Sequence, residues 1–140
     1  SIGALDPLDQ FVDLGSGAGR SVIQAFGTGI SALGVELSLA RHKIAVVALD
    51  HLCQIVQSAH NALCSVQEAH ASLQIGRHKM TLEHGDMLRA DIEGSTMIFL
   101  NSVCFSDELL RAVMLLIVRL PLGTMIASFK KIPGPAAGLF

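Results

Sequence analysis

The stretch Phe11–Arg20 limits the possible folds of this chain more than any other, and it reads Phe-Val-Asp-Leu-Gly-Ser-Gly-Ala-Gly-Arg. It begins as a short apolar run of strand character and turns through three glycines into a helical pattern. Glycine allows a sharp turn and a close approach to a ligand because it has no Cβ. A helix N-terminus adds unpaired N–H groups and a partial positive charge. The stretch therefore predicts a strand, a loop and a helix with a nucleotide-type site at the turn.

The spacing of the glycines separates the classes of nucleotide site. The dinucleotide fingerprint Gly-x-Gly-x-x-Gly needs a glycine where Arg20 stands, and the Gly-Lys-Ser/Thr ending of a P-loop is missing. A carboxylate at Asp13 would repel a pyrophosphate, and it suits an ammonium or a ribose hydroxyl better. The pattern resembles the first motif of class I S-adenosylmethionine-dependent methyltransferases, acidic-x-Gly-x-Gly-x-Gly. The alternative is a glycine-rich turn without a ligand.

Strand and helix patterns alternate along the whole chain. This order predicts a doubly wound α/β fold, a mostly parallel, Rossmann-like sheet covered on both faces that ends after its fifth strand. The 140 residues fit a single domain, 1–140, with a lead-in at 1–9 and a flexible tail at 133–140. We expect strands at 10–14, 31–36, 79–84, 96–100 and 124–130, and helices at 18–26, 37–75 and 107–118.

The segment 37–75 contains neither glycine nor proline. Apolar residues recur in steps of three and four from Ala45 to Leu73, interrupted only by His70, which is typical of one helical face. As a continuous helix it would be roughly 55 Å long. The apolar stripe 45–73 then either packs on the sheet through a kink or projects and needs cover from a partner or an additional segment.

Polar residues stand at the ends of four expected strands: Asp13, Glu36, Asp86 and Asn101. Ligands of such sheets bind at the carboxyl ends of the strands, so these side chains suggest one shared ligand. Glu36 follows Gly15 by 21 residues, which suits an acceptor for ribose hydroxyls. Its alternative role is a solvated charge before a helix.

The neighbouring residues suggest further contacts. Asp86 suits either an adenine amino group or the N-cap of a helix, and Met87 suits the adenine face. Asn101 both donates and accepts, so it suits a substrate or a backbone loop. Phe105 is either the wall of a methyl-transfer channel or a core residue.

Four motifs, at 11–17, 34–36, 81–87 and 98–105, together with the closing stretch 122–131, resemble the catalytic core of histone lysine methyltransferases of the telomeric-silencing disruptor type. The resemblance covers residues 10–132. It implies S-adenosyl-L-methionine as cofactor and a protein substrate, possibly a histone. The expected cofactor-binding residues are Asp13, Gly15, Ser16, Gly17, Gly19, Glu36, Asp86, Met87 and Asn101, and the expected catalytic residues are Asn101 and Phe105.

The chain departs from this family in several ways. The family usually has an aromatic residue where Met87 stands and Gln where Arg20 stands. Its N-terminal helical region, which helps to form the lysine channel, and its basic nucleosome-binding segment have no counterpart in this sequence. The alternative function is therefore a non-catalytic, degenerate methyltransferase fold that binds a cofactor or serves in assembly.

Composition excludes several other classes. A net charge of −2 means that the chain lacks the excess of basic residues that nucleic-acid binding typically needs. The longest apolar run, 112–118, is too short to span a bilayer. The histidines at 42, 51, 60 and 70 are spaced nine, nine and ten residues apart, which scatters them around a helix and predicts no metal site. The three cysteines lack paired spacing and suggest core thiols in a reducing compartment, either nucleus or cytoplasm.

Overall fold

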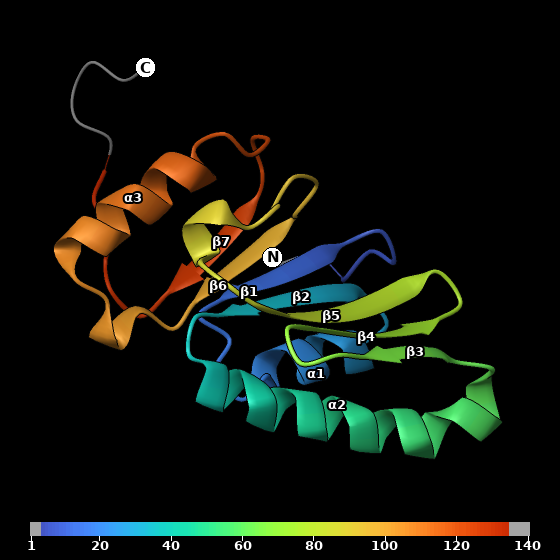
Figure 1. Cartoon of the computed structure of the whole chain (residues 1–140). Helices are drawn as coiled ribbons and strands as arrows, with labels where there is room; N and C mark the ends of the chain where they lie inside the picture. Colours follow the sequence, from blue (N-terminus) through green and yellow to red (C-terminus); the bar gives the residue numbers. More distant parts are fainter. Residues whose placement is uncertain (1–3, 135–140) are drawn as a thin grey trace.

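The computed structural model describes residues 4–134, which form a seven-stranded sheet in the order β3-β4-β5-β2-β1-β6-β7 (Figure 1). The strands are β1 (Gln10–Leu14), β2 (Ser31–Glu36), β3 (Leu63–Val66), β4 (His70–Ile75), β5 (His78–His84), β6 (Met97–Leu100) and β7 (Met125–Ser128). The helices are α1 (Arg20–Gly27), α2 (Leu39–His60) and α3 (Asp107–Ile117), with short 3-10 turns η1 (Met87–Arg89) and η2 (Ser102–Cys104).

Five neighbouring strands, β5-β2-β1-β6-β7, run parallel, whereas β3 and β4 are antiparallel additions at one edge. Helices α1 and α2 cover one face and α3 with η1 covers the other, as Figure 1 shows. Each face has its own buried cluster, one around Leu49, Leu73 and Met80 and one around Leu14, Ile98 and Val113. The predicted doubly wound α/β class is confirmed, but the sheet has seven strands and not the predicted five, because β3 and β4 were not expected.

The predicted helix over 37–75 is wrong, because α2 ends at His60 and the chain continues as the hairpin β3-β4. Asn61 ends the helix in the left-handed conformation, with φ 52°. Asn is one of the few residues other than glycine that adopts this conformation readily. Ala45 and Leu49 pack on the sheet, and Leu73 reaches the same cluster from β4. The stripe 45–73 is therefore not one projecting helical face, and of its residues Leu63 and Val66 remain exposed in β3.

The remaining elements lie within a few residues of their predicted bounds. The strands predicted at 10–14 and 31–36 match β1 and β2. The lead-in has neither helix nor strand over residues 4–9, and a turn there is closed by the N–H of Asp9 donating to the carbonyl oxygen of Asp6. Most of the predicted flexible tail, 135–140, lies outside the described residues, as do residues 1–3 of the lead-in.

The cysteines were expected to be core thiols, and this is only partly right. Cys53 is buried and Cys64 is half-buried, but Cys104 is exposed in η2.

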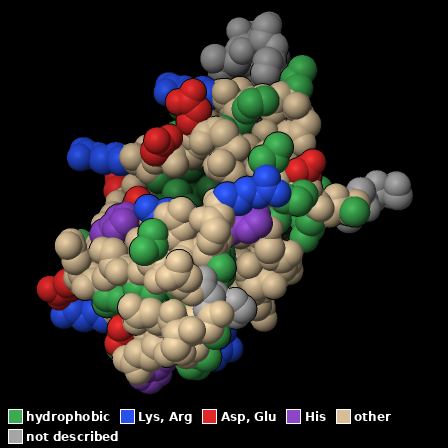
Figure 2. All heavy atoms as spheres, turned by 90° about the vertical axis from the view of Figure 1, so that its right-hand side faces the viewer, with side chains coloured by type: hydrophobic (Ala, Val, Ile, Leu, Met, Phe, Trp, Pro, Cys, Tyr) green, Lys and Arg blue, Asp and Glu red, His purple; other side chains and the backbone are tan. Residues whose placement is uncertain are grey.

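Within residues 4–134, no helix has the length and apolar character needed to cross a membrane. Figure 2 shows the side of the molecule at which the parallel strands begin, where basic side chains are scattered among acidic and hydrophobic ones.

Candidate functional site

The four polar strand ends lie at one edge of the sheet, on four adjacent strands. Their strands β5, β2, β1 and β6 are consecutive neighbours and parallel. The registers align the ends, since Leu14 pairs with both Val35 and Leu100, and Glu36 pairs with His84. Residues up to 88 positions apart in sequence are therefore brought together around the glycine loop, Gly15–Gly19.

The glycine loop adopts a backbone that requires glycine. Gly15, Gly17 and Gly19 have φ values of 87°, 55° and 78°, all in the left-handed region. The N–H groups of Gly15 and Ser16 donate to the carbonyl oxygen of Val35, which fixes the loop against β2. Gly19 is the N-cap of α1 and supplies no capping side chain. Among residues 4–134 no side chain caps α1, so its first N–H groups can bind another acceptor.

Gly34 in β2 allows the loop to pack closely. A Cβ at this position would lie 2.7 Å from Cγ2 of Val22 and 2.8 Å from Oγ of Ser16. This close contact explains why position 34, two residues before Glu36, is a glycine.

Glu36 connects the glycine loop to the start of α2. Its side chain is 2% exposed, and Oε2 accepts the N–H of Gly17 at 2.7 Å. Oε1 accepts the N–H of Ser38 at 2.7 Å and lies 3.2 Å from a guanidinium nitrogen of Arg41. A carboxylate has about four acceptor positions, so Oε2 retains capacity for one further donor.

Asp13 is a buried carboxylate with an unpartnered oxygen. It is 2% exposed, and its Oδ2 accepts a hydrogen bond from the hydroxyl of Ser21. Its Oδ1 is buried and has no hydrogen-bond partner among the described residues. Burial raises the pKa of Asp13 to about 6, the Ser21 hydroxyl opposes this rise, and the charge of Glu36 adds to it. A buried acceptor without a protein donor needs a partner from outside the chain, such as an ordered water, an ion or a ligand.

Met87 and Phe105 lie next to Gly15 of the loop, and Asp86 directly precedes Met87. Asp86 caps η1, with Oδ1 accepting the N–H of Leu88 at 2.9 Å, so its N-cap role is observed and its Oδ2 remains available. Met87 is 9% exposed. A Cβ on Gly15 would lie 3.3 Å from Cζ of Phe105 and 3.5 Å from Cε of Met87. Phe105 is therefore adjacent to the glycine loop while it also packs on the buried cluster below.

Asn101 is exposed at the end of β6, and within the described chain its side chain makes no capping hydrogen bond to η2. Three hydrogen-bonding residues of this region were not predicted from the sequence: Ser21, Ser102 and Ser128. Ser21 bonds Asp13, and the hydroxyls of Ser102 and Ser128 lie 2.7 Å apart. Each of these hydroxyls bonds a residue at least eight positions away in sequence, so no local sequence pattern predicts the contacts.

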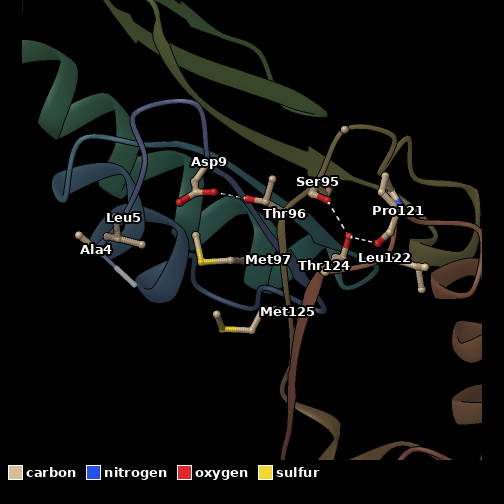
Figure 3. Close-up of a pocket in the computed structure, with 12 residues that line it drawn as sticks. Ala4, Leu5, Asp9, Ser95, Thr96, Met97, Pro121, Leu122, Thr124 and Met125 are labelled. Carbon is tan, nitrogen blue, oxygen red and sulfur yellow. Dashed lines mark hydrogen bonds between the residues drawn. The ribbon is translucent and has the colours of Figure 1, made fainter. Parts of the chain in front are cut away.

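A pocket of about 470 Å³ lies at the other edge of the sheet, where β1, β6 and β7 begin (Figure 3). Its polar groups already bond to one another, since Thr96 donates to Asp9 and Thr124 donates to the carbonyl oxygens of Ser95 and Pro121. It is separate from the carboxyl ends of the strands.

In the part of the chain that the structure describes, no group of three or more His, Cys, Asp or Glu side chains is placed to hold a metal ion.

Comparison with solved structures defines the class of fold. An RNA methyltransferase from Salinibacter ruber, in complex with S-adenosyl-L-homocysteine, is 24% identical, with a TM-score of 0.59 over 88% of this chain and 65% of its own. A SAM-dependent methyltransferase from Geobacter sulfurreducens is 21% identical, with a TM-score of 0.55 over 87% of this chain and 41% of its own. A geranyl diphosphate C-methyltransferase from Streptomyces coelicolor is 20% identical, with a TM-score of 0.52 over 80% and 35%. The chain has the class I methyltransferase fold and spans less than two thirds of these neighbours.

The sequence gives the family. Residues 3–137 match the family described as histone methylation protein DOT1. The chain belongs to this family. No significant match was found among curated protein sequences.

Proposed function

We propose that this chain is the cofactor-binding and catalytic core of an S-adenosylmethionine-dependent methyltransferase whose acceptor is a lysine of a histone. The observation that carries the proposal is Oδ1 of Asp13, which is buried at the end of β1 beside the glycine loop and has no partner among the described residues. Membership in the DOT1 family supports the choice of acceptor. A histone acceptor implies that the protein acts in the nucleus.

The residues around the loop fit the amino-acid end of this cofactor. An ammonium group would give Oδ1 of Asp13 the donor that it lacks, and its charge would stabilise the buried carboxylate. The left-handed glycines leave the loop without side chains that would occupy the ligand's space. The free N–H groups at the start of α1 suit the cofactor carboxylate, because a helix N-terminus attracts negative charge. Ser16 and Gly19 belong to the same loop.

Glu36, Asp86 and Met87 fit the adenosine end. Oε2 of Glu36 can accept a hydrogen bond from one ribose hydroxyl in addition to the N–H of Gly17. Oδ2 of Asp86 suits the adenine amino group, and the apolar side chain of Met87 suits the face of the ring. The backbone around Gly85 and Glu36 is joined by a hydrogen bond of 3.0 Å, which holds these two contacts in a fixed relation.

The chemistry is a direct displacement, for which the bound cofactor supplies a methyl group activated on a sulfonium. The protein's task is then alignment of the acceptor nitrogen with that methyl. Asn101, exposed and without a capping bond, is placed to hold the acceptor or the methionine end of the cofactor. Phe105 provides an apolar wall, and such a wall lowers the pKa of an entering lysine because it removes water from the charged form. The reaction needs no dedicated general base.

The proposal is tested by transfer of tritiated methyl groups from S-adenosylmethionine to core histones. We expect wild-type transfer, at least a hundredfold loss in Asp13→Ala, and a comparable loss in Asn101→Ala. Asp50→Ala is the matched control, because this acidic residue lies on α2, outside the strand ends, where its carboxylate accepts a hydrogen bond from Gln54. Cofactor binding without transfer to any histone would contradict the catalytic proposal and favour a non-catalytic binding module.

A further inference from the structure

The loop that carries Asn101 and Phe105 is tied to the end of β7 by a network of hydrogen bonds. The network starts at Ser102, which is fully buried in η2. Its hydroxyl lies 2.7 Å from the hydroxyl of Ser128 and accepts the backbone N–H of Lys130 at 2.8 Å. The hydroxyl of Ser128 in turn donates to the carbonyl oxygen of Lys130 at 2.8 Å. The beginning of the loop is thus held by two polar groups of one neighbouring segment, the Ser128 hydroxyl and the Lys130 N–H.

The far end of the same loop is fixed by the side chain of Lys130. Its Nζ donates to the carbonyl oxygen of Phe105 at 2.7 Å. The N–H of Phe105 donates to the carbonyl oxygen of Ser102 at 3.0 Å, which closes η2 into a compact turn. A hydrogen bond from a charged donor is stronger than one between neutral groups, so Lys130 restrains the backbone that carries the aromatic ring.

The ring of Phe105 lies close to Gly15 of the glycine loop. Cζ of Phe105 lies 3.3 Å from the point that a Cβ on Gly15 would occupy. The position of Phe105 therefore depends on two contacts, that of its ring with Gly15 and that of its carbonyl oxygen with Lys130. A displacement of the backbone at Phe105 would therefore change the space above Gly15.

We infer that Ser102, Ser128 and Lys130 form a clamp, here called the β7 clamp, whose role is to position Asn101 and Phe105 over the glycine loop for methyl transfer. This inference rests on the proposed function of the site. The three clamp residues are positioning residues, because they act on the reaction through the loop. A misplacement of about 1 Å is enough to cost about a hundredfold in rate when alignment limits the reaction.

The clamp gives different expectations for cofactor affinity and for turnover. The proposed cofactor contacts of Asp13 and Glu36 belong to β1 and β2, which the clamp does not touch. Asn101 lies at the end of the loop that Ser102 holds, whereas the Lys130 ammonium holds the other end, at Phe105. Removing the Lys130 ammonium therefore leaves the KM for S-adenosylmethionine within about twofold, whereas kcat falls at least tenfold, equivalent to about 1.4 kcal/mol of activation free energy.

The first test measures the geometry without any catalytic assay. In protein labelled with ¹³C at the methionine methyl groups, the ring of Phe105 shifts the resonance of the Met87 methyl, because both groups lie within 3.5 Å of the same point above Gly15. We expect Lys130→Met to move this resonance toward its position in the unfolded chain. Lys131→Met, which removes the adjacent exposed lysine, is the matched control and leaves the resonance in place. An unchanged Met87 resonance in Lys130→Met would overturn the clamp.

The second test compares kinetic constants with core histones as the acceptor. Lys130→Met lowers kcat with KM for the cofactor unchanged, and Lys130→Arg restores most of kcat because it retains a charged donor. Equal losses in kcat and in cofactor affinity would contradict a positioning role. If wild-type protein transfers no methyl group, the proposed function fails, and the Met87 resonance still decides whether the clamp holds the loop.

Discussion

Replacing Asp13 with Asn tests the account of the buried carboxylate, because it removes the charge and keeps an acceptor for the Ser21 hydroxyl. Burial raises the pKa of Asp13 from 3.8 to about 6 in the folded chain. The unfolded chain loses its proton first as pH rises, so the stability of the wild type falls between these two values. At about 1.4 kcal/mol per unit, the carboxylate destabilises the fold by up to about 3 kcal/mol above pH 6.

The assay is urea unfolding of wild type and Asp13→Asn at pH 4 and pH 8. We expect nearly equal free energies of unfolding at pH 4 and an advantage of up to about 3 kcal/mol for the variant at pH 8, or about 10 °C in Tm. Asp50→Asn, at a partly exposed position on α2, controls for the substitution itself. The reasoning is refuted if the difference between wild type and Asp13→Asn is the same at both pH values.

Three further substitutions test other parts of the structure. Gly34→Ala lowers the free energy of unfolding by about 1–3 kcal/mol in urea denaturation, because its methyl group would lie 2.7 Å from Val22; Gly85→Ala, with open space around it, is the control. Asn61→Gly preserves or raises stability, whereas Asn61→Val lowers it by at least about 1 kcal/mol, since a β-branched residue resists a φ of 52°; equal stabilities would argue against the observed helix end. Glu36→Gln weakens calorimetric binding of S-adenosylmethionine at least tenfold, and unchanged affinity would remove the ribose contact.

The parallel core could be predicted because its signals are local. The apolar runs at 10–14 and 31–36 are bounded by glycines and polar residues, and they match β1 and β2. In a parallel sheet the order of these units already places their carboxyl ends together. The strand order alone therefore predicts Asp13 and Glu36 at one edge of the sheet, and the register of β1 with β2 brings them together there.

The hairpin β3-β4 and the β7 clamp could not be predicted in this way. Residues 45–73 fit a helical period, but Asn61 reverses the backbone at one position and Leu73 is buried from a strand. A period alone does not separate these cases when the break is one residue other than glycine or proline. The contact of Ser102 with Lys130 joins residues 28 positions apart, and it exists only because β6 and β7 are neighbours.

Calorimetric titration of the chain with S-adenosylmethionine, with NAD as the matched nucleotide control, tests the central claim most directly. The account predicts saturable binding of S-adenosylmethionine, no binding of NAD, and loss of the heat signal in Asp13→Ala with the fold retained. Binding of NAD, or S-adenosylmethionine binding that Asp13→Ala leaves unchanged, would contradict the assignment of this strand edge as the cofactor site.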